Sequence, residues 1–117
     1  MIYDLEERTT KFSKELLSFL TKIPITFFNK NIISQLLRSG TSIGANYQEA
    51  NGSISKKDFK NKISICKKET KETKYWIELL AQIETTQKDQ LRIFWKEAQE
   101  FILIFGKIMF NIDKNKS

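Results

Sequence analysis

Histidine is absent from this chain of 117 residues, and cysteine and proline each occur only once. Without histidine the chain lacks the commonest general base, the commonest zinc ligand and the base of every Ser-His or Cys-His nucleophile pair. The single cysteine, Cys66, can form no disulfide within the chain, and its place in an apolar stripe favours an inert buried thiol. The carboxylates are scattered as surface charges usually are. We therefore expect no catalytic residue, no metal site and no cofactor.

Long hydrophobic runs are also missing from the sequence. The longest, Phe101–Phe105, is far shorter than the roughly 20 residues that a membrane-spanning helix needs. The start of the chain, Met1–Arg8, is acidic and periodic, whereas a signal peptide is basic and then continuously apolar. The sequence therefore predicts a cytoplasmic protein with no membrane partner.

Apolar residues recur at steps of three and four in four segments of the chain, and proline and glycine are scarce, at one and four residues. This spacing is that of one face of an α-helix. The segments are separated by Pro24, by Asn51–Ser53 and by Thr85–Thr86, and they predict helices over residues 4–23, 30–51, 55–84 and 87–113. Such helices bury their stripes most simply as an all-α, antiparallel up-down-up-down four-helix bundle, which forms a single domain over residues 1–117.

Local signals agree with these boundaries. Asp4 followed by Glu7, and Ser55 followed by Asp58, are typical of the first turn of a helix. The segment Ser39–Ala45 is unusually rich in small residues for the middle of a helix, where each glycine costs about 1 kcal/mol relative to alanine. We interpret this segment as a place where two helices approach each other closely.

The predicted third and fourth helices carry more apolar surface than one bundle needs. Beside their core stripes they hold a second set of apolar residues, which consists of Ile65, Trp76, Leu79 and Ile83 in the third helix and Leu103 and Ile104 in the fourth. Scattered exposed apolar residues are ordinary on a monomer, so this set also has a plain explanation. Its clustering on two adjacent helices favours self-association, and we expect these residues to form an oligomer interface.

Positive charge is concentrated in the predicted third helix. The chain has 20 lysines and arginines against 14 acids, a net charge of +6, and residues 56–74 hold eight lysines against three acids. A basic face of this kind is suited to a phosphate backbone. We expect the nucleic-acid-binding residues to be Lys56, Lys57, Lys60, Lys67, Lys71, Lys74 and Arg38. Near that face, Arg38 and Tyr75 are the side chains that can stack on a base. The alternative is a solvated face that only keeps the protein soluble.

A family resemblance covers nearly the whole chain. The segment Gln35–Ala50 contains a Gln-Leu-x-Arg motif and a Ser-Ile-x-Ala-Asn motif, and a serine and an aromatic residue follow at Ser55 and Phe59. Together with the lysine-rich helix after them, these motifs resemble the 23S ribosomal RNA intervening sequence protein family. The chain departs from the family pattern at Ala50, where glycine is usual, and at Ser53, where arginine is frequent.

The resemblance implies a bacterial, non-enzymatic four-helix bundle that assembles as a ring, typically a pentamer. Some members are encoded inside intervening sequences of ribosomal RNA genes. A related branch is the accessory variability protein of diversity-generating retroelements, which works beside a reverse transcriptase on nucleic acid. We therefore expect a homo-oligomer that binds RNA or DNA without strong sequence preference. The alternative is a scaffold that recruits a partner protein, such as a nucleic-acid-processing enzyme, and an uncharacterised enzyme is the least favoured hypothesis.

Overall fold

The computed structural model describes residues 4–114, so the ends of the predicted domain, residues 1–3 and 115–117, lie outside the described residues. Between residues 4 and 114 the chain forms helices α1 (Leu5–Leu20), α2 (Lys30–Asn51), α3 (Lys56–Ile83) and α4 (Lys88–Lys114), with no strand. A short 3-10 helix, η1 (Thr85–Gln87), joins α3 to α4. The predicted all-α class with four helices is confirmed. Within this range no helix combines the length and the apolar character that crossing a membrane requires.

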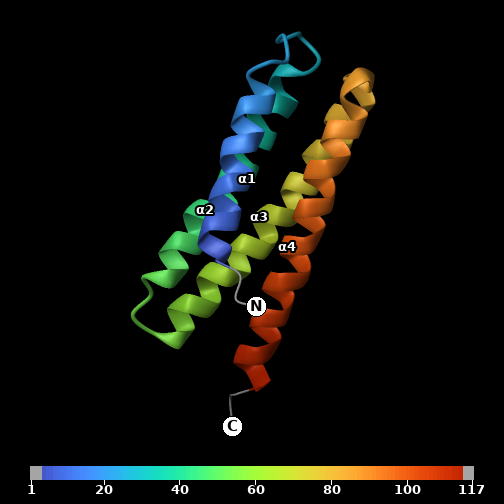
Figure 1. Ribbon diagram of the computed structural model, residues 1–117. Helices are drawn as coiled ribbons and strands as arrows, with labels where there is room; N and C mark the ends of the chain where they lie inside the picture. The colour runs from blue at the N-terminus through green and yellow to red at the C-terminus, as the bar shows by residue number, and fades with distance from the viewer. Residues whose placement is uncertain (1–3, 115–117) are drawn as a thin grey trace.

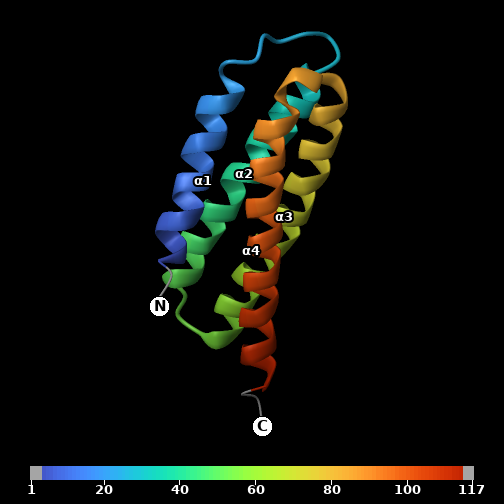
Figure 2. The same cartoon turned by 45° about the vertical axis from the view of Figure 1, so that its right-hand side comes forward.

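The helices lie side by side along a rod of 51 × 22 × 21 Å, and each connection reverses the direction of the chain (Figures 1 and 2). Contacts between α3 and α4 show the same reversal. Lys60 pairs with Asp113 near one end of the two helices, and Trp95 donates to Glu78 nearer the other end. The start of α1, the end of α4 and the α2–α3 turn lie toward one end of the rod, and the other two connections lie at the opposite end.

Side-chain caps begin two of the helices where the sequence predicts them. The Asp4 carboxylate accepts a hydrogen bond from the backbone N–H of Glu7 at 3.1 Å. The Ser55 hydroxyl accepts one from the backbone N–H of Asp58 at 3.0 Å. Each bond satisfies one of the amide groups that the first turn of a helix leaves without a partner.

Helix α1 ends at Leu20, three residues before the predicted end at Ile23. Beyond Leu20 the chain tightens into turns in which Lys22 N–H donates to Phe19 and Ile23 N–H donates to Leu20, each at 3.2 Å. The reason is Pro24, because a proline ring disfavours the α conformation in the residue before it. Ile23 is still buried, as its place in the stripe predicts.

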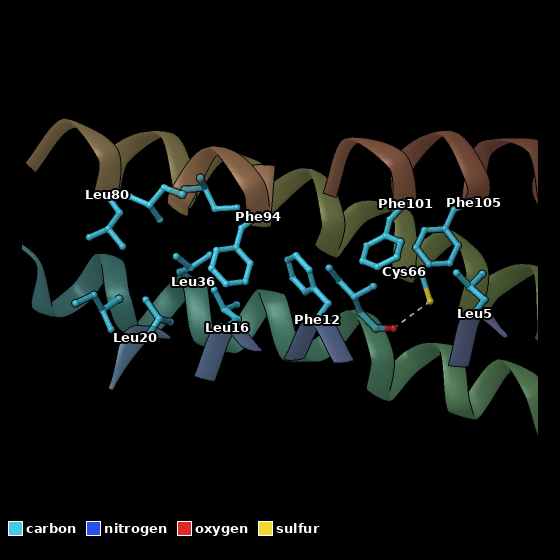
Figure 3. Packing of buried hydrophobic residues seen from close by; sticks show 14 of the residues in the cluster. Leu5, Phe12, Leu16, Leu20, Leu36, Cys66, Leu80, Phe94, Phe101 and Phe105 are labelled. Carbon is cyan, nitrogen blue, oxygen red and sulfur yellow. Dashed lines mark hydrogen bonds between the residues drawn. The ribbon is translucent and has the colours of Figure 1, made fainter. Parts of the chain in front are cut away.

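The core is a continuous column of apolar side chains along the rod (Figure 3). Phe12 of α1 contacts Phe94 and Phe101 of α4 edge to face, with ring centroids 5.7 and 5.5 Å apart. Aromatic pairs in this geometry are stabilising beyond the area that they bury. Figure 3 shows these rings meeting between the ribbons of α1 and α4.

Two glycines of α2 let α1 approach closely, as the small residues of this segment predict. A Cβ atom on Gly44 would lie 3.3 Å from the backbone oxygen of Thr9, and a Cβ atom on Gly40 would collide with the Leu16 side chain. Both glycines are buried. The loss of helix propensity at these positions is therefore offset by close packing, against the α1 backbone at Gly44 and against the Leu16 side chain at Gly40.

The connection between α1 and α2 is held by Asn29, which is fully buried. The Asn29 side chain accepts from Thr26 N–H at 2.7 Å and donates to the Pro24 carbonyl at 2.9 Å and to the Glu84 carboxylate at 3.0 Å. Three apolar side chains of this ordered connection, which we name the apolar tip, are exposed to solvent: Ile25, Phe27 and Phe28.

Candidate nucleic-acid interface

The lysines of α3 that face α4 are spaced by two helical turns, at Lys60, Lys67 and Lys74. Lys60 forms an ion pair with Asp113. The ammonium of Lys67 lies over Gly106 of α4, 3.6 Å from the position that a Cβ atom would take there. The predicted lysine face therefore includes a row of cations along the line where α3 meets α4.

Lys74 of this row contacts two side chains of α4. Its ammonium lies 4.2 Å from the centre of the Trp95 ring, a cation–π contact, and it also donates to the Gln99 side chain. The Trp95 indole N–H in turn donates to the Glu78 carboxylate at 2.9 Å. These contacts between α3 and α4 hold the Lys74 charge at the surface in one position.

Helix α4 adds cations that the sequence interpretation missed: Lys88, Arg92 and Lys96. Their spacing of four residues places them on one side of α4, and this spacing is the signal that would have found them. They line a hollow of about 420 Å³ between α3 and α4. A second hollow, of about 360 Å³, adjoins it at Glu78 and is lined by Lys71, Lys74, Tyr75 and Gln99.

We name this surface the basic seam and define it by Lys67, Lys71, Lys74, Lys88, Arg92 and Lys96. Five of these cations line the two hollows, where Glu78 is the one carboxylate among the lining residues. The hydrogen bond from Trp95 already engages Glu78. A surface with this excess of positive charge attracts polyanions.

The remaining predicted lysines lie farther along α3. Lys56 and Lys57 are exposed in its first turn, about 15 Å along the helix axis from Lys67. Lys56 lines a separate hollow of about 550 Å³ together with Ile54 and Phe59. The structure thus divides the predicted lysine face into a group at the α2–α3 turn and a group on the basic seam.

Arg38 lies on the other side of α3, at its contact with α2. Its guanidinium pairs with Glu69 at 3.1 Å and also with Glu72. The Glu72 carboxylate accepts a further bond from the Trp76 indole at 3.0 Å. The two carboxylates hold Arg38 on the side of the bundle that α2 and α3 form, which we name the α2–α3 flank; the opposite side is the α1–α4 flank. The structure therefore does not bring Arg38 together with the lysines of the basic seam.

Five of the six predicted interface residues fall on two flanks of the bundle. The four on α3, which are Ile65, Trp76, Leu79 and Ile83, share the helical face of Glu69 and Glu72 and so lie on the α2–α3 flank. Ile104 lies one turn from Glu100, which pairs with Arg8 of α1, so it lies toward the α1–α4 flank. Ile83 and Leu103 are exposed, and the other four are partly buried.

Cys66 is fully buried among core residues, as predicted. Its thiol donates to the Ile43 carbonyl at 3.6 Å, the contact drawn as a dashed line in Figure 3. Burial raises the pKa of this thiol to about 12, so it stays protonated at neutral pH. A protonated, buried thiol is a poor nucleophile.

Comparison with known proteins gives independent evidence on the family of this chain. Residues 3–106 match the family described as 23S rRNA-intervening sequence protein. A crystal structure of a protein with unknown function from the S23 ribosomal protein family of Bacteroides thetaiotaomicron is 32% identical, with a TM-score of 0.76. The similarity covers 89% of this chain and 96% of that one. No curated protein matches this chain. Because the family match extends over α1, α2, α3 and most of α4, the chain belongs to the 23S rRNA-intervening sequence protein family.

Proposed function

We propose that this protein is a non-enzymatic, homo-oligomeric, antiparallel four-helix bundle that binds RNA or DNA through the basic seam. One observation supports this function above all: five cations and a single, already bonded carboxylate line two adjoining hollows on one face. Each phosphate that such a surface neutralises releases condensed counterions, which favours binding without reading the base sequence. Lys56 and Lys57 would extend the contact toward the α2–α3 turn.

Reversing the charge of two seam lysines, Lys67→Glu with Lys71→Glu, is expected to weaken binding to a labelled RNA roughly tenfold at low salt. The plot of log K against log salt should become shallower by about two, because about one phosphate contact is lost for each lysine. Fluorescence anisotropy over a series of salt concentrations measures both quantities.

The matched control carries the same charge change away from the seam, as Lys30→Glu with Lys114→Glu. Both of these lysines are exposed, and both lie near helix ends. If the seam variant binds RNA as tightly as the control, the basic seam is not the binding site.

The two flanks differ in shape and in charge, and this difference supports the proposed oligomer. The α2–α3 flank presents the apolar side chains of Trp76, Leu79 and Ile83, which we name the ridge, beside the carboxylates of Glu69 and Glu72. The α1–α4 flank carries a groove of about 880 Å³ whose lining includes Phe19 and Ile93 and has four basic side chains, Arg8, Lys11, Lys14 and Lys22, against two acids, Glu15 and Glu97. The ridge, with two carboxylates against one arginine, carries a net negative charge, and the net positive charge and apolar side chains of the groove complement it.

Two different surfaces that fit each other make a heterologous contact, and such contacts close into rings when the rotation allows it. The pentameric ring that the family resemblance implies is an assembly of this kind. The basic seam lies between the two flanks, so this contact would leave it uncovered on every subunit. Repetition around a ring would multiply the weak contacts of one subunit with a long polyanion.

Placing two positive charges on the ridge, as Leu79→Lys with Ile83→Lys, is expected to convert the oligomer into a monomer. The new ammonium groups would face the lysines of the groove, and like charges across a contact oppose association, whereas neither side chain is fully buried within the single subunit. Size-exclusion chromatography with light scattering gives the mass, and circular dichroism checks that the helices remain. Leu17→Lys, at an exposed position of α1 outside the groove lining, is the control. A wild-type monomer, or an unchanged mass in the variant, would contradict the ring.

The second candidate function is a scaffold that recruits a partner protein. The apolar tip favours it, because the Phe27 side chain is 91% exposed although Asn29 holds the connection in one conformation. Ordered, exposed aromatic side chains are common anchors of protein interfaces. Recovery of one stoichiometric protein partner after nuclease treatment would favour the scaffold over nucleic-acid binding.

A further inference from the structure

Tyr75 is the exposed aromatic residue of the basic seam. Its side chain is 54% exposed and lines the same hollow as Lys71, Lys74 and Gln99. The ring contacts Trp76 edge to face, with centroids 5.1 Å apart and an angle of 70° between the planes. Tyr75 is therefore supported on one side by a neighbouring ring and open to solvent elsewhere.

The second aromatic ring of the seam has a different role. Trp95 is covered by the Lys74 ammonium at 4.2 Å and is anchored through its N–H to Glu78. A ring engaged in this way positions a cation and is not an open platform for a base. The stacking surface of the seam is thus Tyr75, which shares its hollow with Lys71 and Lys74, and the adjoining hollow holds the cations of α4.

The spacing of the seam cations suits an extended strand. Lys88, Arg92 and Lys96 follow one another at about 6 Å along α4, and Lys67, Lys71 and Lys74 at about 4.5 to 6 Å along α3. The seam runs for about 24 Å between Lys67 and the end of α3, which is long enough for several nucleotides. When a single strand lies along the seam, its phosphates contact the cations and one of its bases contacts Tyr75.

A duplex cannot use Tyr75 in the same way. Its bases are stacked on one another inside the helix, so a ring on the side of an α-helix meets phosphates and sugars instead. The lysines attract both kinds of nucleic acid, but only an unpaired base can stack on an exposed ring. We infer that the basic seam prefers single-stranded RNA or DNA to duplex, with one unpaired base stacked on Tyr75. This inference rests on the proposed function and names its ligand class.

The test compares a short labelled single strand with the duplex of the same sequence, at one low salt concentration. Tyr75→Ala is expected to weaken binding to the single strand roughly tenfold and to leave duplex binding nearly unchanged. Tyr75→Phe, which keeps the ring, should bind the single strand like the wild type. Phe27→Ala, at an exposed ring outside the seam, is the matched control and should bind both ligands normally.

The outcomes separate this inference from the proposed function. Equal affinity for single strand and duplex, or an equal loss on both in Tyr75→Ala, would overturn the stacking role while the lysine variant still defines a binding surface. If the wild-type protein binds neither ligand at low salt, the proposed function and this inference fail together. Circular dichroism of Tyr75→Ala checks that the helices are retained, as expected for a half-exposed position.

Discussion

Replacing Phe101 by alanine is expected to lower the free energy of unfolding by about 3 to 5 kcal/mol. The Phe101 side chain is fully buried in α4, contacts Phe12 and Phe105, and lies 5.3 Å beneath the Arg8 guanidinium. The substitution removes apolar surface from the core and leaves a cavity that the surrounding helices cannot close. Typical domains are stable by only about 5 to 15 kcal/mol. A loss of about 3 to 5 kcal/mol therefore brings the protein close to global unfolding at elevated temperature.

Urea denaturation followed by circular dichroism measures the change in stability. The comparison should be made at one protein concentration, because assembly of folded subunits adds concentration-dependent stability. Phe110→Ala in the same helix is the control, since the Phe110 side chain is exposed. A loss at Phe101 no larger than the loss at Phe110 would show that this ring is not part of a tightly packed core.

Replacing Gly44 by leucine is expected to lower the free energy of unfolding by about 2 to 3 kcal/mol, through overpacking. A Cβ atom alone would lie 3.3 Å from the backbone oxygen of Thr9, and the longer side chain must occupy the space of the α1 backbone. Helix α1 must then move away from α2. The loss should appear in urea denaturation and in faster amide hydrogen exchange of α1.

Gly106 in α4 provides the control for this prediction. A Cβ atom there would lie 3.6 Å from the flexible ammonium of Lys67, an ordinary contact. Gly106→Ala is therefore expected to raise stability by up to about 1 kcal/mol, because alanine is the better helix former. If Gly44→Leu proves as stable as the wild type, α1 and α2 do not meet at the distance described.

The core could be predicted from the sequence because burial follows the helical period. In α3, the stripe from Ile63 to Leu80 at steps of three and four is buried throughout. The end of α1 was predicted three residues too late, because the turns before Pro24 keep Ile23 in the apolar stripe although the helix has already ended. Periodicity alone does not distinguish a last helical turn from a tight turn of similar rise.

The candidate site was less predictable, because it depends on which residues meet across helices. Lysine spacing indicates a basic face on α3, but the pairing of Lys60 with Asp113 and the capture of Arg38 by Glu69 are set by the alignment of different helices. The contribution of Arg92 likewise depends on α4 lying beside α3. A single helix pattern carries no information on such partners.

The buried Asn29 has a consequence for how the helices are aligned. Apolar stripes that repeat every three or four residues pack almost equally well after a slip of one helical turn, about 5.4 Å. The hydrogen bond from Asn29 to Glu84 links the α1–α2 connection to the end of α3. A slip would separate these groups and leave a buried amide without its partner. Asn29 therefore selects one register of the bundle, as a single buried asparagine does in coiled coils.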